Sequence, residues 1–310
     1  MRILFWGTPE FAVPSLRALD DEGFDIVGVV TQPDRPAGRG RVTRPSPVKS
    51  VASALGLDVL APDSPKEAGF LERVRGLEPD LSVVVAYGHI LTTDMLEAPS
   101  LGSINVHASL LPALRGAAPI NWAIARGHPT TGVTIMRMVR AMDAGAIIHQ
   151  VEEPILDDET ASELSVRLSE LGAEALVEAL ALLSAGDLEE EEQDHAAATF
   201  APKIDRQVAR IDWTKPAREV AWHIRAMDEV PGAWSALGEE PVKFFRPSAP
   251  IAVVSPVAPG TVIQANGGLI VATGEGGAVK FDEVQPSGGR RMGASEWIRG
   301  RRITAGTRFA

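Results

Sequence analysis

The sequence predicts an α/β protein with a mostly parallel sheet in its N-terminal part and a smaller β-barrel at its C-terminal end. Over the first 150 residues, short apolar runs alternate with helix-like segments, which is the pattern of a parallel sheet covered by helices. From about residue 206, proline and glycine become frequent between short β-like runs, as in small barrels. The 310 residues, of which 45% are hydrophobic and 23% charged, fit two globular domains. We expect domains at residues 1–186 and 206–310, joined by a linker at 187–205.

Five apolar runs predict the strands of the first sheet, at residues 3–6, 26–31, 81–86, 104–106 and 133–138. Between the first two runs, Thr8 and Pro9 have the order of an N-cap and a proline at the first helical position. Gly23 has the position of a glycine that ends this helix. This order of elements predicts a Rossmann-like domain.

Two more helices have start signals of their own. Ser46-Pro47 repeats the order of cap and proline. Thr160 and Glu163 have the spacing of a capping box, at the start of a long helix that ends at Gly186. The acidic run that follows, at residues 187–194, is interpreted as a solvated face or turn.

Four short β-like runs predict the strands of the C-terminal barrel, at residues 242–245, 261–264, 269–273 and 279–284. Turn residues separate them at short intervals. This spacing predicts a small, OB-like barrel.

The absence of cysteine excludes disulfides, Cys-ligated metal centres and thiol nucleophiles. The six histidines show no metal-binding spacing, so we expect no metal. No apolar run reaches the roughly 18 residues of a membrane span, and the first residues are typical of a strand rather than of a targeting peptide. We therefore expect a cytoplasmic protein without membrane contact.

Basic residues are concentrated in two segments of a chain whose net charge is -11. Residues 287–310 contain six arginines and one glutamate. Residues 33–49 contain five basic residues and one aspartate. Because binding follows the local potential, such segments can hold phosphates; solvated loop arginines are the alternative. The basic residues of the segment 33–49 are Arg35, Arg39, Arg41, Arg44 and Lys49.

Asn105 and His107 are candidate catalytic residues near the end of a predicted strand. Side chains two residues apart on a strand point to the same face, which places an amide donor beside a titratable base. Open α/β sheets bind ligands beyond the carboxyl ends of their strands. Asp143 follows the strand predicted at 133–138, and we expect its carboxylate to meet His107 from a parallel strand end. The alternative is that Asn105 and His107 only satisfy the backbone of a turn.

An amide, an imidazole and a carboxylate suit the attack of an amine on a carbonyl carbon, in which an oxyanion forms and protons move. Asn105 would donate a hydrogen bond to the oxyanion, and His107 would stabilise or protonate it. Asp143 would raise the pKa of the imidazole and fix its orientation. This chemistry needs no covalent nucleophile.

Further motifs accompany these three residues along the whole chain, up to about Arg302. They are Gly7-Thr8-Pro9-Glu10, residues 31–40, Val84-Val85-Ala86-Tyr87-Gly88, Asn105-Val106-His107, Ser109-Leu110-Leu111-Pro112, Arg115-Gly116, Ala209-Arg210-Ile211-Asp212-Trp213 and Gln285-Pro286-Ser287-Gly288-Gly289. In this order and spacing they resemble the folate-dependent formyltransferases, most closely the branch that acts on methionyl-tRNA. The chain departs from that family around Asp143, where Met142 and Ala144 replace the usual leucine and threonine.

The resemblance implies transfer of a formyl group from 10-formyltetrahydrofolate to the amino group of methionine on initiator tRNA. It implies that Asn105, His107 and Asp143 are catalytic, that the segment 33–49 contacts the tRNA, and that the C-terminal barrel binds tRNA. The residues expected to contact the folate are Tyr87, Gly88, Ile90, Ser109, Leu110, Leu111 and Pro112.

Two other functions stay open. The same three catalytic residues would serve a folate-dependent formyltransferase that acts on an amino sugar nucleotide or on glycinamide ribonucleotide, although the basic segment 33–49 and the long C-terminal part disfavour these acceptors. A non-catalytic tRNA-binding protein would not need all three. In each case we expect a monomer without an obligate protein partner.

Overall fold

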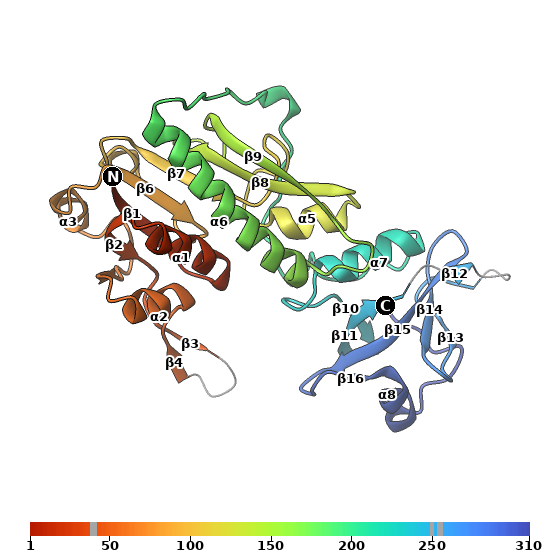
Figure 1. Cartoon of the computed structure of the whole chain (residues 1–310). Helices are drawn as coiled ribbons and strands as arrows, with labels where there is room; N and C mark the ends of the chain where they lie inside the picture. Colours follow the sequence, from red (N-terminus) through yellow and green to blue (C-terminus); the bar gives the residue numbers. More distant parts are fainter. Residues whose placement is uncertain (38–41, 249–250, 253–256) are drawn as a thin grey trace. The chain divides into compact units, whose positions relative to one another are not determined.

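The computed structural model describes residues 1–37, 42–248, 251–252 and 257–310 (Figure 1). The chain forms two compact units. The first unit comprises Met1–Gly116, Thr131–Glu153 and Ser165–Phe200, and the second comprises Ala117–Thr130, Pro154–Leu164 and Ala201–Ala310. Two earlier segments of the chain therefore group with its last 110 residues. The domain boundaries at residues 186 and 206 stay a prediction.

The main sheet has seven strands in the order β5-β2-β1-β6-β7-β8-β9. Their bounds are Arg2–Gly7 (β1), Asp25–Val30 (β2), Val59–Leu60 (β5), Leu81–Val85 (β6), Ser103–His107 (β7), Thr130–Arg137 (β8) and Ile147–Pro154 (β9). The strands from β5 to β7 run parallel, and β8 runs antiparallel to β7. All five predicted strands are present, and the mostly parallel α/β class is confirmed. The sequence analysis missed β5, β9 and the hairpin formed by β3 (Arg35–Ala37) and β4 (Val42–Arg44).

The first helical segment begins later than predicted. The Thr8 hydroxyl does not cap it, because this hydroxyl donates to the Tyr87 carbonyl at 3.0 Å. The chain instead forms the 3-10 turn η1 (Glu10–Ala12) and then α1 (Val13–Asp21). The cap of α2 (Pro47–Ala54) is confirmed, since Ser46 Oγ accepts from the Lys49 backbone nitrogen at 3.0 Å. The short helices α3 (Phe70–Gly76) and α4 (Thr93–Leu96) follow.

The long helix α6 (Ala161–Ala185) begins at the predicted capping box. Glu163 Oε2 accepts from the Thr160 backbone nitrogen at 2.9 Å, and Thr160 Oγ1 accepts from the Glu163 backbone nitrogen at 3.3 Å. The bond from the Thr160 backbone nitrogen and a second bond that Thr160 Oγ1 donates to Glu163 Oε2 at 2.8 Å, together with Arg246, lower the pKa of Glu163 to about 2. Further along, α6 lies against the face of the main sheet, and a Cβ at Gly172 would be 2.9 Å from Val106 Cγ1. No helix in the described part of the chain is long and apolar enough to cross a membrane.

The second unit contains a curled antiparallel sheet in the order β10-β11-β15-β14-β13, with β12 and β16 also paired to β15. The bounds are Trp234–Leu237 (β10), Glu240–Pro247 (β11), Ile251–Ala252 (β12), Val262–Gln264 (β13), Leu269–Ala272 (β14), Gly277–Pro286 (β15) and Met292–Gly293 (β16). Its helices are α5 (Pro119–Ala125), α7 (Ala217–Ala226) and α8 (Ala294–Arg301). The rings of Trp213, Phe244, Phe281 and Phe309 form its core, with centroids 5.0–6.2 Å apart. The four predicted strands are present, and the sheet forms a half-barrel.

Candidate active site

Asn105 and His107 lie on β7, with His107 at its carboxyl end, as predicted; β7 is an interior strand of the main sheet. Asn105 is paired with Val84 of β6 and Met136 of β8, and His107 with Thr134 of β8. His107 is only 6% exposed. The side-chain amide of Asn105 is partly buried and forms no hydrogen bond with any residue that the structure describes. It is therefore available to a ligand.

The surroundings of His107 determine which of its nitrogens carries the proton. Nε2 lies 3.1 Å from the Leu114 carbonyl oxygen, and because a carbonyl only accepts, Nε2 is the protonated nitrogen. Nδ1 then has the free lone pair, and it faces Asp143 Oδ2 at 3.8 Å. Burial lowers the pKa of His107 below its ordinary value, and this outweighs Asp143 and the Leu114 carbonyl, which raise it. Asp143 thus raises the pKa of the imidazole as expected, but burial has the larger and opposite effect.

Asp143 reaches His107 by a different route from the predicted one. Because β8 is antiparallel to β7, its carboxyl end lies beside the start of β7 and not beside His107. The loop between β8 and β9 returns across the sheet instead. Gly145 permits this return, since a Cβ there would be 1.9 Å from the Arg137 carbonyl oxygen. Asp143 has a φ of 48°, and its Oδ2 accepts from the Gly116 backbone nitrogen at 2.7 Å.

The backbone of the predicted folate loop, residues 109–112, forms hydrogen bonds with side chains of β8 and β9. The hydroxyl of Thr134 donates to the Ser109 carbonyl at 2.6 Å and accepts from the Leu111 backbone nitrogen at 3.1 Å. Gln150 donates to the Leu111 carbonyl at 2.8 Å. Ser109 and Leu111 are buried, whereas Leu110 and Pro112 are partly exposed. Thr134 and Gln150 were not predicted as site residues, because nothing in their local sequence marks them.

The second predicted folate segment, residues 87–90, divides into a buried and an exposed part. The Tyr87 ring lies in the core at 5.3 Å from the Trp6 ring, and burial raises the pKa of its hydroxyl to about 12. Gly88 lies against Gln32, because a Cβ there would be 2.4 Å from Gln32 Nε2. Ile90 is 76% exposed, which leaves an apolar side chain for a ligand.

The basic segment forms the hairpin β3–β4, which extends from the first unit near α2 (Figure 1). Arg35 and Arg44 are paired across it, exposed, and without an ion pair to any described residue. Lys49 instead binds Asp34 at 2.8 Å. Arg39 and Arg41 lie outside the described residues.

The acidic segment 187–194 contains a residue that the sequence analysis missed. Its carboxylates are exposed as predicted, although Glu190 pairs with Arg137 at 2.8 Å. Gln193 in contrast is 5% exposed and binds the backbone of the Asp143 loop. An uncharged residue within an acidic run was the only available signal.

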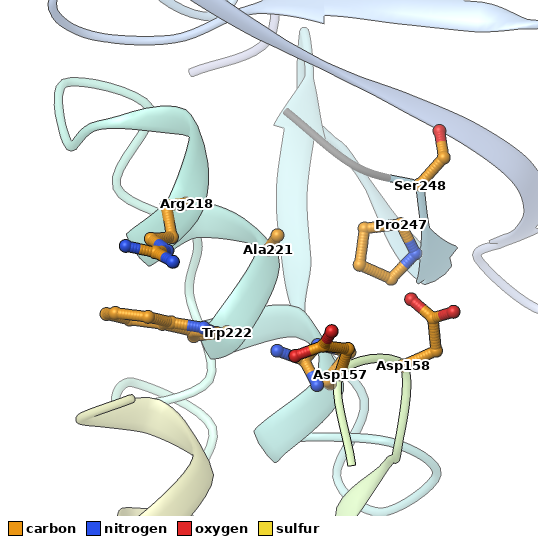
Figure 2. A pocket seen from close by; sticks show the side chains of 8 residues that line it. Asp157, Asp158, Arg218, Ala221, Trp222, Pro247 and Ser248 are labelled. Atoms are coloured by element: carbon orange, nitrogen blue, oxygen red, sulfur yellow. The ribbon is translucent and has the colours of Figure 1, made fainter. Parts of the chain in front are cut away.

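A separate cavity of about 340 Å³ lies in the second unit (Figure 2). Trp222 and Ala221 of α7 line it together with Pro247, Asp157 and Asp158. The Arg218 guanidinium lies over the Trp222 ring (Figure 2), with its carbon 5.2 Å from the ring centroid. None of the predicted catalytic or folate residues lines this cavity.

Comparisons with known proteins match both halves of the chain. The sequence model of a family described as "Formyl transferase" matches residues 1–180, and that of "Formyl transferase, C-terminal domain" matches residues 203–302. A methionyl-tRNA formyltransferase of Bacillus mycoides (strain KBAB4) is 46% identical over 310 residues, which is 100% of this chain and 98% of the relative. One of Bacillus thuringiensis (strain Al Hakam) is 45% identical with the same coverage.

Solved structures share the fold at lower identity. The N-formyltransferase of Helicobacter canadensis, in complex with folinic acid and dTDP-3-aminofucose, has a TM-score of 0.69 at 18% identity and covers 90% of this chain and 98% of its own. HypX from Aquifex aeolicus in complex with tetrahydrofolic acid has a TM-score of 0.62 at 19% identity. That match covers 96% of this chain and 47% of HypX, so the chain spans about half the length of HypX.

A mostly parallel α/β sheet and a curled antiparallel sheet, with a buried histidine beside a carboxylate in the first unit, are compatible with an enzyme that uses acid–base chemistry. The matches to both halves are more specific. The chain belongs to the formyl transferase family.

Proposed function

We propose that this enzyme transfers the formyl group of 10-formyltetrahydrofolate to the free amino group of methionyl-initiator tRNA. The observation that carries the proposal is the 46% identity, over the whole chain, to a relative named methionyl-tRNA formyltransferase. The pairing of His107 with Asp143 beside an available Asn105 amide supports it independently, because this is the chemistry that amine attack on a formyl carbon needs.

The residues around the site fit a folate donor. Ile90 and Leu110 offer exposed apolar surface to a flat ring system. His89 Nε2 is buried and has no hydrogen-bond partner among the described residues, so it can pair with a polar ring atom. The folate would also contact the backbone and the surface contour formed by Gly88, Ser109, Leu111 and Pro112. Tyr87 would not contact the folate itself. Its buried ring would support the His89 ring, whose centroid lies 5.5 Å away. The bound donor supplies the formyl group and a leaving nitrogen.

Each catalytic residue has a distinct role in this proposal. The Asn105 amide donates a hydrogen bond to the formyl oxygen as negative charge develops on it. His107 Nδ1 accepts a proton from the attacking amine and returns it to the leaving nitrogen, so the proton count closes. Asp143 stabilises the imidazolium that exists between these two transfers. The Nε2–H bond to Leu114 holds the ring with Nδ1 towards Asp143, the side on which we place the reaction.

The tRNA would be bound by both ends of the chain. Arg35 and Arg44 present unpaired charges on the hairpin β3–β4, and Arg39 and Arg41 would add to them. Lys49 would first have to exchange its bond to Asp34 for a phosphate. We further propose that residues 1–186 form the catalytic domain, that residues 206–310 bind tRNA, and that the enzyme works as a monomer in the cytoplasm without a metal.

The proposal is tested by formyl transfer from labelled 10-formyltetrahydrofolate to methionyl-initiator tRNA, with uncharged tRNA and an amino sugar nucleotide as parallel acceptors. We expect label on the charged tRNA alone. Label on the amino sugar nucleotide, but not on the charged tRNA, would overturn the acceptor and favour a sugar nucleotide acceptor, as suggested by the N-formyltransferase structure with dTDP-3-aminofucose. Binding of tRNA without any transfer would overturn the catalytic assignment.

A further inference from the structure

Gln193 joins the Asp143 loop to the segment that holds His107. Its Nε2 donates to the carbonyls of Asp143 at 2.9 Å and Gly145 at 2.7 Å. Its Oε1 accepts from Arg115 Nε at 3.1 Å and from an Arg115 terminal nitrogen at 2.6 Å. Both side chains are buried, with 5% exposure for Gln193 and 6% for Arg115. One amide group therefore makes four hydrogen bonds out of contact with water.

These partners require an amide. Arginine can only donate and a backbone carbonyl can only accept, so the residue between them must do both. Glutamate would satisfy Arg115 but would place a carboxylate oxygen against two carbonyl oxygens. Methionine would fill the same space and make none of the four bonds. The chemistry of the site thus distinguishes glutamine from its closest replacements.

Arg115 lies between two residues that contact the catalytic pair. The carbonyl of Leu114 accepts from His107 Nε2, and the backbone nitrogen of Gly116 donates to Asp143 Oδ2. The segment 114–116 is also bound to the chain that follows Gln193, because the Arg115 backbone nitrogen donates to the Thr199 carbonyl at 2.9 Å. Movement of Gln193 would therefore be transmitted to both His107 and Asp143.

We propose that Gln193 is a positioning residue of this active site, which acts through Arg115 and the Asp143 loop to hold the Asp143 carboxylate at His107 Nδ1. This inference rests on the proposed function, since it takes His107 and Asp143 as the catalytic pair. The loop needs such support because Asp143 has a left-handed backbone and its carboxylate contacts His107 at 3.8 Å only, beyond hydrogen-bond length. A shift of about 1 Å in a catalytic group can lower turnover by about a hundredfold.

The first experiment compares Gln193→Met with the wild type in steady-state formyl transfer. We expect kcat to fall by about ten- to a hundredfold, with the KM values for both substrates within about threefold. Gln193→Glu should be similarly impaired. The matched control is Asn121→Leu in the second unit, which removes an amide bond to the Ala226 carbonyl at 2.6 Å and should keep kcat within about twofold. A kcat of Gln193→Met equal to that of the wild type would overturn the proposal.

The second experiment separates positioning from loss of structure. In single-turnover reactions, Gln193→Met should cost less than about twofold in an Asp143→Asn background, because the group that it positions is already disabled. Equal losses in both backgrounds would mean that Gln193 does not act through Asp143. Thermal unfolding of all variants identifies any that fail to fold. If Gln193→Met is one of them, Arg115→Lys replaces it, because lysine keeps the charge but lacks the planar pair of donors.

The third measurement does not depend on the acceptor. The pKa of His107, followed by NMR titration of labelled histidine, should be lower in Gln193→Met than in the wild type, because the Asp143 charge that raises it is no longer held in place. An unchanged pKa would contradict the inference about Gln193. If the enzyme formylated a different acceptor, the proposed function would fail, but this titration would still decide the role of Gln193.

Discussion

The site around His107 and the hairpin β3–β4 are the two regions of the first unit that we assign to function, and they are built in opposite ways. His107 is buried, and its ring contacts Leu114 and Asp143 at defined distances. Arg35 and Arg44 are exposed and make no ion pair with described residues. A proton-transfer site needs fixed geometry and exclusion of water, whereas a phosphate contact needs accessible charge. Mutations should therefore act on different kinetic constants in the two regions.

The largest effect is expected at the buried site. His107→Ala should lower kcat by about a hundredfold to ten-thousandfold, because it removes the group that moves the proton. Folate affinity, measured by equilibrium binding, should change by less than about threefold. A variant with normal turnover would remove His107 from the mechanism.

The pH dependence of kcat tests the same site with smaller changes. Because burial lowers the pKa of His107, the neutral ring should persist below the ordinary value of 6.5, and the acidic limb of the profile should lie below that pH. Asp143→Asn removes a charge that raises this pKa, so the limb should move to still lower pH while kcat falls about tenfold or more. A limb that moves to higher pH would contradict the assignment of the limb to His107.

Mutations in the hairpin β3–β4 should change kcat/KM for the charged tRNA rather than the rate of the chemical step. Arg35→Ala combined with Arg44→Ala should lower kcat/KM for the charged tRNA by about tenfold and reduce the slope of log(kcat/KM) against log salt by about 2. The KM for the folate should not change. Arg73→Ala, an exposed arginine on α3, is the matched control. If the salt slope of the double variant equals that of the control, the hairpin does not contact the tRNA.

The smallest effect is expected at Glu163, which caps α6 outside both regions. Its pKa is about 2 in the folded protein against an ordinary value of 4.5, so its contribution to stability is complete above about pH 4.5 and is lost as the pH falls towards 2. Its side chain is 46% exposed, and screening by water limits the contribution to about 1 kcal/mol. Unfolding of Glu163→Gln, measured from pH 2 to 7, should lack this part of the acid dependence. An acid dependence identical to that of the wild type would show that Glu163 titrates normally.

The sequence predicted the strand positions of Asn105 and His107 better than the way in which Asp143 reaches them. Asn105 and His107 followed from the two-residue period of a strand, which is a local property. Asp143 was expected from a parallel strand end, and it reaches His107 although β8 is antiparallel, because its loop returns across the sheet. The direction of a strand relative to its neighbour depends on the connections between them, and no local pattern records it. Thr8 shows the same limit, since a distant carbonyl takes the hydroxyl that would have capped the helix.

Features that depend on neighbouring residues could be predicted from the sequence. They are the strands and their period, the caps at Ser46 and Thr160, the order of the two folds, and the presence of an amide, an imidazole and a carboxylate. The behaviour of these groups depends on the folded chain. Folding buries His107 so that desolvation outweighs the Asp143 charge, and it brings Gln193 to the Asp143 loop from 50 residues away in the chain. Burial and long-range hydrogen bonds arise from packing between distant segments, and packing exists only once the chain has folded.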